Sequence, residues 1–130
     1  MKRIFLLEDT EIVAVAMKMM ISSLLTPTTK VVHAYNIADA VDLLSEAGSA
    51  PEEFDLAILD YNLPDGLGTE LIQTFRTSAG NCKVCVCSAH VGKNEVVTRE
   101  ISMQGPDAML GKPMALSDFE KMLRETGICA

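Results

Sequence analysis

Three carboxylates of this chain follow two short apolar runs and are of the type that binds a divalent cation. Asp60 ends the run 56–60, and Glu8 and Asp9 follow the run 4–7. Both runs are typical of strands buried on both faces, and parallel strands bring their carboxyl ends to one edge of a sheet. Each like-charged pair about 4 Å apart costs on the order of 1 to 4 kcal/mol, depending on the local dielectric. If the two strands are neighbours, we expect either a cation among the three carboxylates or a proton that they share.

Oxygen ligands of this kind favour Mg²⁺, which keeps several of its waters and needs only one or two carboxylates from a protein. Glu8, Asp9 and Asp60 are the predicted ligands. The backbone carbonyl of Asn62 is a further predicted ligand, because a loop residue two positions beyond Asp60 can turn its carbonyl inward.

A hydroxyl and an ammonium are predicted to reach the same edge from two further strands. Ser88 ends the apolar run 83–88, and Lys112 follows the run 107–110. Beside a carboxylate alone, Lys112 would be explained as a salt-bridge partner. Together with Mg²⁺ and Ser88 it indicates phosphoryl transfer, in which the two cations offset the charge on the phosphoryl oxygens. Ser88 would donate to one of these oxygens, and Asp60 would be the nucleophile.

Short apolar runs alternate along the chain with longer amphipathic stretches. The pattern predicts strands at about 3–8, 30–35, 55–60, 83–88 and 107–110. It predicts helices at about 11–25, 37–47, 67–77, 93–104 and 117–126, with Asn36 and Ser117 as N-caps. This alternation is typical of an α/β fold, with a parallel sheet and helices on both of its faces.

The length of 130 residues and the 48% of hydrophobic residues are those of one domain with one core, so we expect a single domain over 1–130. The net charge of −7 argues against direct binding to nucleic acid, whose phosphates require Lys and Arg. No apolar run approaches the roughly 18 residues that span a bilayer, and Glu8 interrupts the first run too early for a secretory signal. We therefore expect a cytoplasmic protein that does not bind membranes. Met1 favours a complete chain over a segment of a longer one.

With these residues in place, the sequence resembles the receiver domain of bacterial response regulators in two-component signalling, including the chemotaxis regulators. The resemblance spans essentially the whole chain. The shared positions are the acidic metal-binding pair, the phosphoacceptor aspartate, the loop glycine, the switch hydroxyl, and the lysine before a usually cis proline: Glu8 with Asp9, Asp60, Gly68, Ser88, and Lys112 with Pro113. The resemblance implies a flavodoxin-like (βα)5 fold, a doubly wound parallel sheet with strand order 2-1-3-4-5.

The resemblance also implies a function. A sensor histidine kinase or a histidine phosphotransfer protein would donate the phosphoryl group of a phosphohistidine to Asp60, with Mg²⁺ as the cofactor. The domain would assist its own phosphorylation and dephosphorylation without being a dedicated enzyme. The phosphoaspartate adds up to about two negative charges, which would draw Ser88 and Lys112 toward it. The resulting conformational switch would control a downstream protein target.

One position departs from the pattern of the family. Many members have Tyr or Phe in the fifth strand, three residues before the lysine, whereas this chain has Met109. A flexible thioether fills the same space but transmits a weaker two-state signal, so we expect the output change mainly in the loop and helix after Ser88. In that loop His90, together with Asn62, is predicted to tune the lifetime of the phosphoryl group. His33 lies in the middle of a strand and is interpreted as structural.

The helix predicted at 11–25 has two apolar stripes. The first is wide enough to face the core and consists of Val13, Ala16, Met17, Met20 and Leu24. The second lies beside it and consists of Ile12, Val15 and Met19. A helix more deeply buried than usual would explain the second stripe. So would a docking surface for a helix of the kinase or phosphotransfer protein, because Met-rich surfaces adapt to their partners.

Other functions fit the sequence less well. A phosphatase of the haloacid-dehalogenase type typically has an aspartate two residues after the nucleophile, where this chain has Asn62. A flavodoxin-type cofactor module needs a hydroxyl- and glycine-rich phosphate loop, where this chain has the acidic segment 8–11. A receiver-fold scaffold that acts without phosphorylation stays open as an alternative, although the site residues are all present.

The cysteines suggest a metal site at first, because Cys82, Cys85 and Cys87 lie close together in the sequence. On a strand, however, Cys85 and Cys87 share one face and Cys82 points to the other, so the three thiols do not converge on one ion. We interpret them as small buried hydrophobic residues.

Overall fold

Five parallel strands form the central sheet of the computed structural model, which describes residues 2–46, 48–76 and 81–129. Their order across the sheet is β2 (Lys30–Ala34), β1 (Arg3–Leu7), β3 (Leu56–Asp60), β6 (Lys83–Ser88) and β7 (Ala108–Gly111). Counted along the chain, these five strands have the order 2-1-3-4-5. The predicted α/β class and the flavodoxin-like strand order are therefore confirmed.

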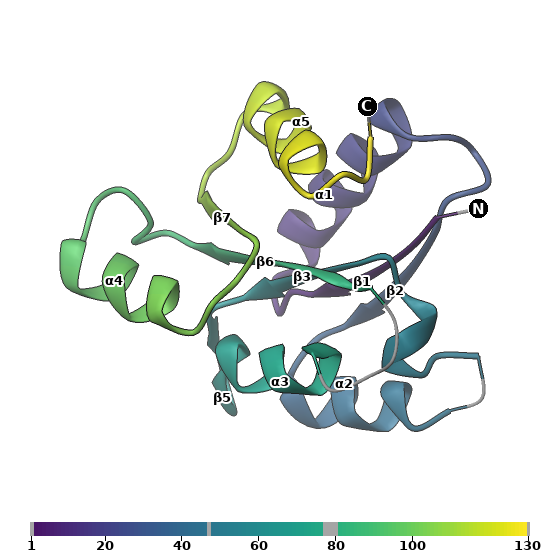
Figure 1. Ribbon diagram of the computed structural model, residues 1–130, viewed down its shortest axis with the longest axis horizontal. Coiled ribbons are helices and arrows are strands. Elements are labelled where there is room, and N and C mark those ends of the chain that lie inside the picture. Colours follow the sequence, from purple (N-terminus) through teal and green to yellow (C-terminus); the bar gives the residue numbers. More distant parts are fainter. Residues whose placement is uncertain (1, 47, 77–80, 130) are drawn as a thin grey trace.

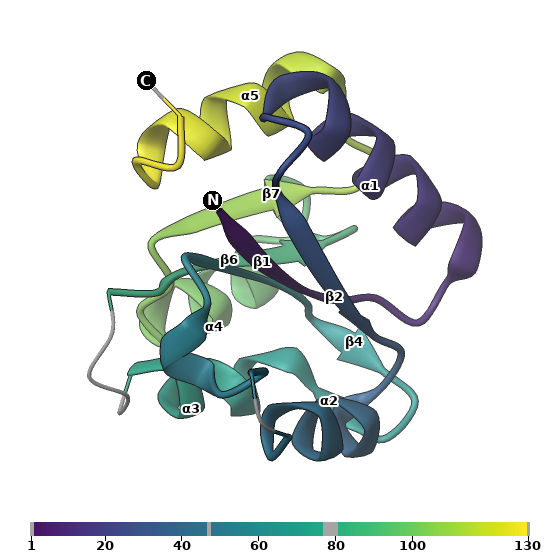
Figure 2. The same ribbon diagram turned by 90° about the vertical axis from the view of Figure 1, so that its right-hand side faces the viewer.

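Helices cover both faces of this sheet (Figure 1). On one face lie α1 (Glu11–Leu24) and α5 (Leu116–Glu125), which contribute to one core cluster. On the other face lie α2 (Ile37–Leu44), α3 (Ile72–Arg76) and α4 (Glu95–Met103), which contribute to a second cluster. Figure 2 shows the sheet from the side, between the layer of α1 with α5 and the layer of α2 with α3.

The strands are buried because their alternate residues enter two different cores. In β1, Ile4 and Leu6 pack toward α1 and α5, whereas Phe5 and Leu7 pack toward the opposite helices. All four side chains are fully buried. The unbroken apolar runs seen in the sequence are thus the mark of a sheet covered on both sides.

The third helix begins later than predicted. Residues Gly68–Leu71 form a 3₁₀ turn (η2), and α3 continues from Ile72 to Arg76. The predicted ends of two helices, residue 47 for the second and residue 77 for the third, lie outside the described residues. A second short 3₁₀ turn, η1 (Pro51–Glu53), precedes β3.

A small hairpin lies directly after β3 and was missed by the sequence analysis. Its strands are β4 (Asn62–Leu63) and β5 (Gly66–Leu67), which pair antiparallel. The Asp65 carboxylate at its tip accepts hydrogen bonds from the backbone N–H groups of Ile37 and Ala38, both at 3.0 Å. The loop that follows Asp60 is therefore attached to the first turn of α2.

One of the two predicted N-caps is correct. Asn36 caps α2, and its side chain accepts from the backbone N–H of Asp39 at 2.7 Å. Ser117 is not a cap, because α5 begins at Leu116 and Ser117 lies inside it. The Asp118 carboxylate instead accepts from the backbone N–H of Ala115 at 2.9 Å and so fixes the helix start two residues earlier.

The surface of α1 excludes one of the two explanations of its second stripe. Ile12 is 78% exposed and Met19 67% exposed, with Val15 also exposed. The interpretation of an unusually buried helix is therefore wrong. The buried side of α1 is formed by Ala14, Met17 and Ile21, and Ala16, which was predicted to face the core, is exposed.

The cysteine side chains lie on the two faces of the sheet as the alternation predicts. Cys85 and Cys87 pack toward α1 and α5, and Cys82 packs toward the other helices. All three are free thiols. Burial raises the pKa of Cys82 to about 12, so this thiol stays protonated and is a poor metal ligand at neutral pH.

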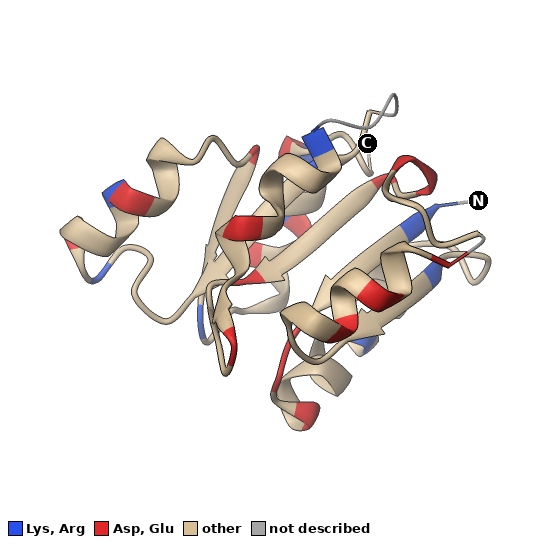
Figure 3. Ribbon diagram, turned by 90° about the horizontal axis from the view of Figure 1, so that it is seen from below, with Lys and Arg blue, Asp and Glu red and all other residues tan. Residues whose placement is uncertain are grey.

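Charged residues are unevenly distributed on the side of the molecule formed by α2 and α3. Figure 3 views the molecule from the side of α2 and α3, where the helices carry more acidic than basic residues, such as Asp39 and Asp42 on α2. Within the described ranges, the longest apolar stretch in any helix is too short to cross a bilayer.

Candidate functional site

The three predicted carboxylates meet at one edge of the sheet. Asp60 is the last residue of β3, and Glu8 and Asp9 follow β1, which pairs with β3 so that Leu7 lies opposite Leu59. One oxygen from each of the three side chains lies within 4.8 Å of the others. Glu8 is only 1% exposed and Asp60 only 6%. The parallel pairing thus places two buried carboxylates and one exposed carboxylate at a single point.

Lys112 supplies the positive charge at this point. Its Nζ lies 2.5 Å from Oε1 of Glu8 and 2.9 Å from Oδ1 of Asp60. The lysine follows β7, and its backbone N–H donates to the carbonyl oxygen of Ser88 at 3.0 Å. The peptide bond between Lys112 and Pro113 is cis, as the resemblance implied. The ammonium therefore joins carboxylates that come from two other strands.

The electrostatics of the cluster leave Asp60 short of positive charge. Burial raises the pKa of the Asp60 carboxyl to about 7, because desolvation outweighs the opposing effect of Lys112 and the charge of Glu8 adds to it. For Lys112, burial by itself lowers the pKa, but the hydrogen bonds to Glu8 and Asp60 outweigh it and raise the pKa above its ordinary value. The lysine stays charged, and Asp60 readily takes up a proton unless a further cation arrives.

This donor set fits Mg²⁺. All its side-chain ligand atoms are carboxylate oxygens, which a hard divalent cation prefers over nitrogen or sulfur. Positive charge at this point would favour the ionised form of Asp60. A bound cation would therefore lower the pKa of Asp60 and keep its carboxylate available as a nucleophile.

Ser88 lies at the end of β6 and is buried, with 2% of its surface exposed. Its Oγ accepts a hydrogen bond from the backbone N–H of His90 at 3.1 Å. Because the oxygen is the acceptor in this bond, the hydroxyl proton is available for a second, donated bond. The loop after β6 thus holds the hydroxyl in place through the backbone of His90.

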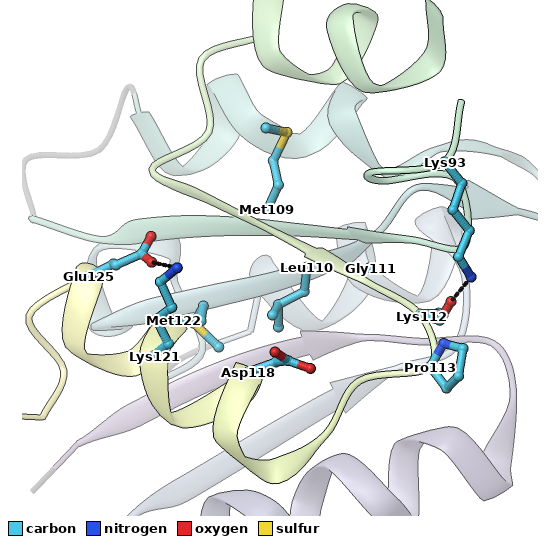
Figure 4. Close-up of a pocket in the computed structure, with 10 residues that line it drawn as sticks. All are labelled: Lys93, Met109, Leu110, Gly111, Lys112, Pro113, Asp118, Lys121, Met122 and Glu125. Atoms are coloured by element: carbon cyan, nitrogen blue, oxygen red, sulfur yellow. Dashed lines mark hydrogen bonds and ion pairs between the residues drawn. The ribbon is translucent and has the colours of Figure 1, made fainter. Parts of the chain in front are cut away.

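The remaining predicted residues lie around the cluster. Asn62 is exposed in β4, two residues beyond Asp60, and the side chain of His90 is exposed in the loop after β6. Met109 is half-buried in β7 and points away from α5 toward α4 (Figure 4). In the same view Lys93 reaches the carbonyl oxygen of Lys112 at 3.5 Å, which links the loop before α4 to the loop after β7.

Gly68 allows the loop after β3 to fold back against the backbone of Asp60. Its backbone N–H donates to the carbonyl oxygen of Tyr61 at 2.8 Å. A Cβ atom on this residue would lie 1.9 Å from the carbonyl oxygen of Asp60, far inside van der Waals contact. Any larger residue must therefore move the backbone that carries Asp60.

Two contacts to this region have no signal in the sequence. The Tyr61 hydroxyl donates to Oε2 of Glu100 at 3.5 Å, which connects the neighbour of Asp60 to α4. His33 contacts the carbonyl oxygen of Glu8. Both pairs are far apart along the chain, so only the folded arrangement could have identified them.

The family model for the response regulator receiver domain matches the sequence over residues 4–124. The chain belongs to the response regulator receiver family. It is accordingly a receiver domain of a two-component system, with the buried acidic cluster at the carboxyl edge of its sheet. No curated protein matches the chain.

Several solved receiver structures have the same fold. The signal receiver domain of a DNA-binding response regulator from Colwellia psychrerythraea 34H is 21% identical, with a TM-score of 0.79, and the match covers 99% of this receiver and all (100%) of that domain. TrrA of Thermotoga maritima, solved in complex with Mg²⁺ and BeF, is 19% identical, with a TM-score of 0.73 and coverage of 97% and 99%. DrrB of Thermotoga maritima, an OmpR/PhoB homologue, is 17% identical, with a TM-score of 0.75. That match covers 95% of this receiver but 51% of DrrB, so this receiver spans about half the length of DrrB.

Substitution of Gly68 should damage both the fold and the site. In Gly68→Ala the added methyl group overpacks against the backbone of Asp60, and we expect a loss of about 1–3 kcal/mol in the free energy of unfolding. The displaced carboxylate should also weaken Mg²⁺ binding. Chemical denaturation and a Mg²⁺ titration followed by amide chemical shifts measure the two effects.

Gly127→Ala is the matched control for this substitution. Gly127 has φ of +74° and open space around the position of a Cβ, so the variant loses stability through backbone strain alone. It should bind Mg²⁺ like the wild type. A Gly68→Ala protein with unchanged Mg²⁺ affinity would show that Gly68 does not position Asp60.

Proposed function

We propose that Asp60 of this receiver accepts a phosphoryl group from a phosphohistidine in a Mg²⁺-dependent reaction, and that the phosphoaspartate switches the domain to control a protein partner. The observation that carries the proposal is the contact of buried Asp60 with the Lys112 ammonium, inside a cluster of three carboxylates. An acid used only for stability would be better replaced by an apolar residue at such a buried position. The resemblance to TrrA, solved with Mg²⁺ and BeF, supports the same chemistry.

The chemistry assigns one task to each group. A carboxylate oxygen of Asp60 attacks the phosphorus atom, and the bond from phosphorus to the histidine nitrogen breaks. The electron pair of that bond stays on the imidazole nitrogen, which takes up a proton. Lys112 pairs with a phosphoryl oxygen, and Ser88 donates its free proton to another.

Glu8, Asp9 and Asp60 would hold Mg²⁺, with the backbone carbonyl of Asn62 as a further ligand. The ion supplies positive charge that offsets the phosphoryl oxygens. The domain itself assists both the gain and the loss of its phosphoryl group, and we propose no other substrate. We infer that it is a single receiver domain over 1–130, working in the cytoplasm.

Incubation with acetyl phosphate and Mg²⁺, followed by mass measurement of the intact protein, tests the reaction. The wild type should gain the mass of one phosphoryl group, whereas Asp60→Asn and a wild-type sample with excess chelator should gain nothing. Decay of the modified species in His90→Ala should differ from the wild type, because the exposed side chain of His90 flanks the site. An Asp60→Asn protein that is modified as fast as the wild type would end the proposal.

The switch should act through the loop after β6 and through α4. Phosphorylation adds negative charge beside Asp60, toward which Ser88 and Lys112 are drawn. Oγ of Ser88 accepts from the backbone N–H of His90, and its carbonyl oxygen accepts from the backbone N–H of Lys112, so the loops after β6 and β7 should move with Ser88. Met109 lacks the ring that would carry the change along β7.

Binding of BeF₃⁻, a phosphoryl mimic, should therefore shift the amide resonances of residues 88–103 most strongly. Two-dimensional amide spectra with and without BeF₃⁻ measure this, and Asp60→Asn, which should show no shifts, is the control. In Met109→Tyr the shifts should extend into β7. Shifts confined to β7 in the wild type would contradict this location of the switch.

We infer that a helix of the kinase or phosphotransfer protein docks on α1. An apolar groove of about 450 Å³ lies between α1 and the loop after β7 and reaches Lys112. Ile12 of the exposed stripe lines it together with Ala16 and Met20. Val15 and Met19, the rest of the stripe, line a neighbouring hollow on α1. A helix placed there would bring its phosphohistidine to the edge that carries Asp60.

Substitution of the exposed stripe by serine, in Ile12→Ser/Val15→Ser/Met19→Ser, should slow transfer from a phosphorylated partner about tenfold or more. This corresponds to a loss of roughly 1.4 kcal/mol in binding. The rate with acetyl phosphate should not change, because the small donor needs no docking surface. Phosphotransfer and acetyl phosphate assays on the same variants measure the difference.

The control removes apolar surface elsewhere. Val96 and Met103 of α4 are 66% and 78% exposed, and Val96→Ser/Met103→Ser should leave transfer from the partner unchanged. Equal slowing of both donors in the α1 variant would rule out a docking role for the stripe.

A further inference from the structure

His33 occupies a position in β2 from which it reaches the acidic loop. β2 is the edge strand beside β1, with His33 paired to Leu6 and Ala34 to Leu7. Ala34 packs toward α2 and α3, so alternation directs His33 to the face covered by α1. There its Nε2 lies 2.9 Å from the carbonyl oxygen of Glu8. The carbonyl can only accept, so Nε2 carries the proton and donates it.

This bond is one of two that join β2 to the backbone of Glu8. The backbone N–H of Glu8 donates to the carbonyl oxygen of Ala34 at 3.0 Å and continues the ladder of the sheet. Its carbonyl group has passed the end of the paired strand, because β1 ends at Leu7. The imidazole therefore holds one peptide group beyond the end of the ladder, namely the peptide that joins Glu8 to Asp9.

The imidazole ring is itself held in place. Its centroid lies 4.1 Å from that of the Tyr35 ring. The Glu11 carboxylate raises the pKa of the Tyr35 hydroxyl, which indicates that Tyr35 lies near the first turn of α1. The other ring nitrogen of His33, Nδ1, is buried without a hydrogen-bond partner in the described part of the chain. The ring thus bonds the loop through Nε2 and packs against the ring of Tyr35.

We propose that His33, supported by Tyr35, is a positioning residue for the metal site: its imidazole fixes the peptide from which the carboxylates of Glu8 and Asp9 project. The inference rests on the proposed function of those carboxylates. Oε1 of Glu8 contacts Lys112, and Oε2 accepts from the backbone N–H of Thr10 at 3.1 Å. Glu8 is thus held at its side chain by two groups, whereas the peptide that leads to exposed Asp9 depends on His33.

A positioning role predicts a specific effect on Mg²⁺ affinity. Groups that orient metal ligands without touching the metal typically change affinity 10–100-fold when they are removed. Here one of three carboxylates loses its support, so we expect the Kd for Mg²⁺ to rise about tenfold at most in His33→Phe. The phenyl ring keeps the contact with Tyr35 but cannot donate to Glu8. In His33→Gln the side-chain amide again places a donor near the carbonyl oxygen, and the Kd should return to within about threefold of the wild type.

The experiment is a Mg²⁺ titration of the purified full chain, followed by amide chemical shifts, with the melting temperature measured on the same samples. Val31→Ala is the matched control, because Val31 lies two residues earlier on the same face of β2 and packs against the core beneath α1. It should lower the melting temperature and leave the Kd unchanged. If His33→Phe does not fold, Tyr35→Leu at the exposed neighbouring ring should raise the Kd two- to threefold.

The outcomes separate this inference from the proposed function. An unchanged Kd in His33→Phe, or in Tyr35→Leu if the former does not fold, would overturn the positioning role while Mg²⁺ binding by the wild type still stands. A raised Kd in His33→Phe with no recovery in His33→Gln would also overturn it. The effect would then come from loss of the imidazole ring and not from loss of the donated hydrogen bond. Absence of Mg²⁺ binding by the wild type would overturn both.

Discussion

The ammonium of Lys112 between Glu8 and Asp60 is the interaction on which the rest of the site depends. Two carboxylates that are nearly inaccessible to water could not remain ionised beside each other without it, because desolvation and mutual repulsion both oppose the charges. The ammonium offsets one of three negative charges. With Asp9 included, the ionised cluster keeps two net negative charges, which is the deficit that one divalent cation removes. Burial raises the pKa of Asp60 to about 7 and the charge of Glu8 adds to this, so a proton on Asp60 can take the place of the missing positive charge.

The pairing of the strands brings these charged groups to one edge of the sheet. The pairing of β1 with β3 sets Glu8 beside Asp60, and the pairing of β6 with β7 sets Ser88 opposite Gly111, directly before Lys112. In each of these strands the polar residue follows the last apolar residue, so the charged groups lie outside the hydrophobic core. The chain then turns away directly after β3, and Gly68 lies so close to the carbonyl oxygen of Asp60 that a Cβ atom would not fit there.

Much of this could be predicted from the sequence because it depends on patterns of short range. Unbroken apolar runs indicate buried strands, and a carboxylate at the end of such a run indicates the edge of the sheet, which is how Asp60 and Glu8 were identified. The strand order came from the resemblance, since spacing cannot say which strands are neighbours. The Ser117 cap failed because a serine and the nearby Asp118 compete for the same helix start, and the carboxylate reaches one turn back. The contacts of His33 and Tyr61 join residues 25 and 39 positions apart, and no local pattern marks such pairs.

The same long-range contacts suggest how a receiver with Met109 can transmit a change at Asp60. Tyr61 follows Asp60 directly, and its backbone N–H donates to the carbonyl of Cys87 while its hydroxyl reaches Glu100 on α4. A shift of the Asp60 backbone would therefore reach the end of β6 through the backbone of Tyr61, and α4 through its side chain. In other members of the family, an aromatic ring at position 109 would change its orientation when Ser88 moves. In this chain the ring of Tyr61 stands directly after Asp60 instead, so the contact with α4 begins one residue from Asp60 and does not involve β7.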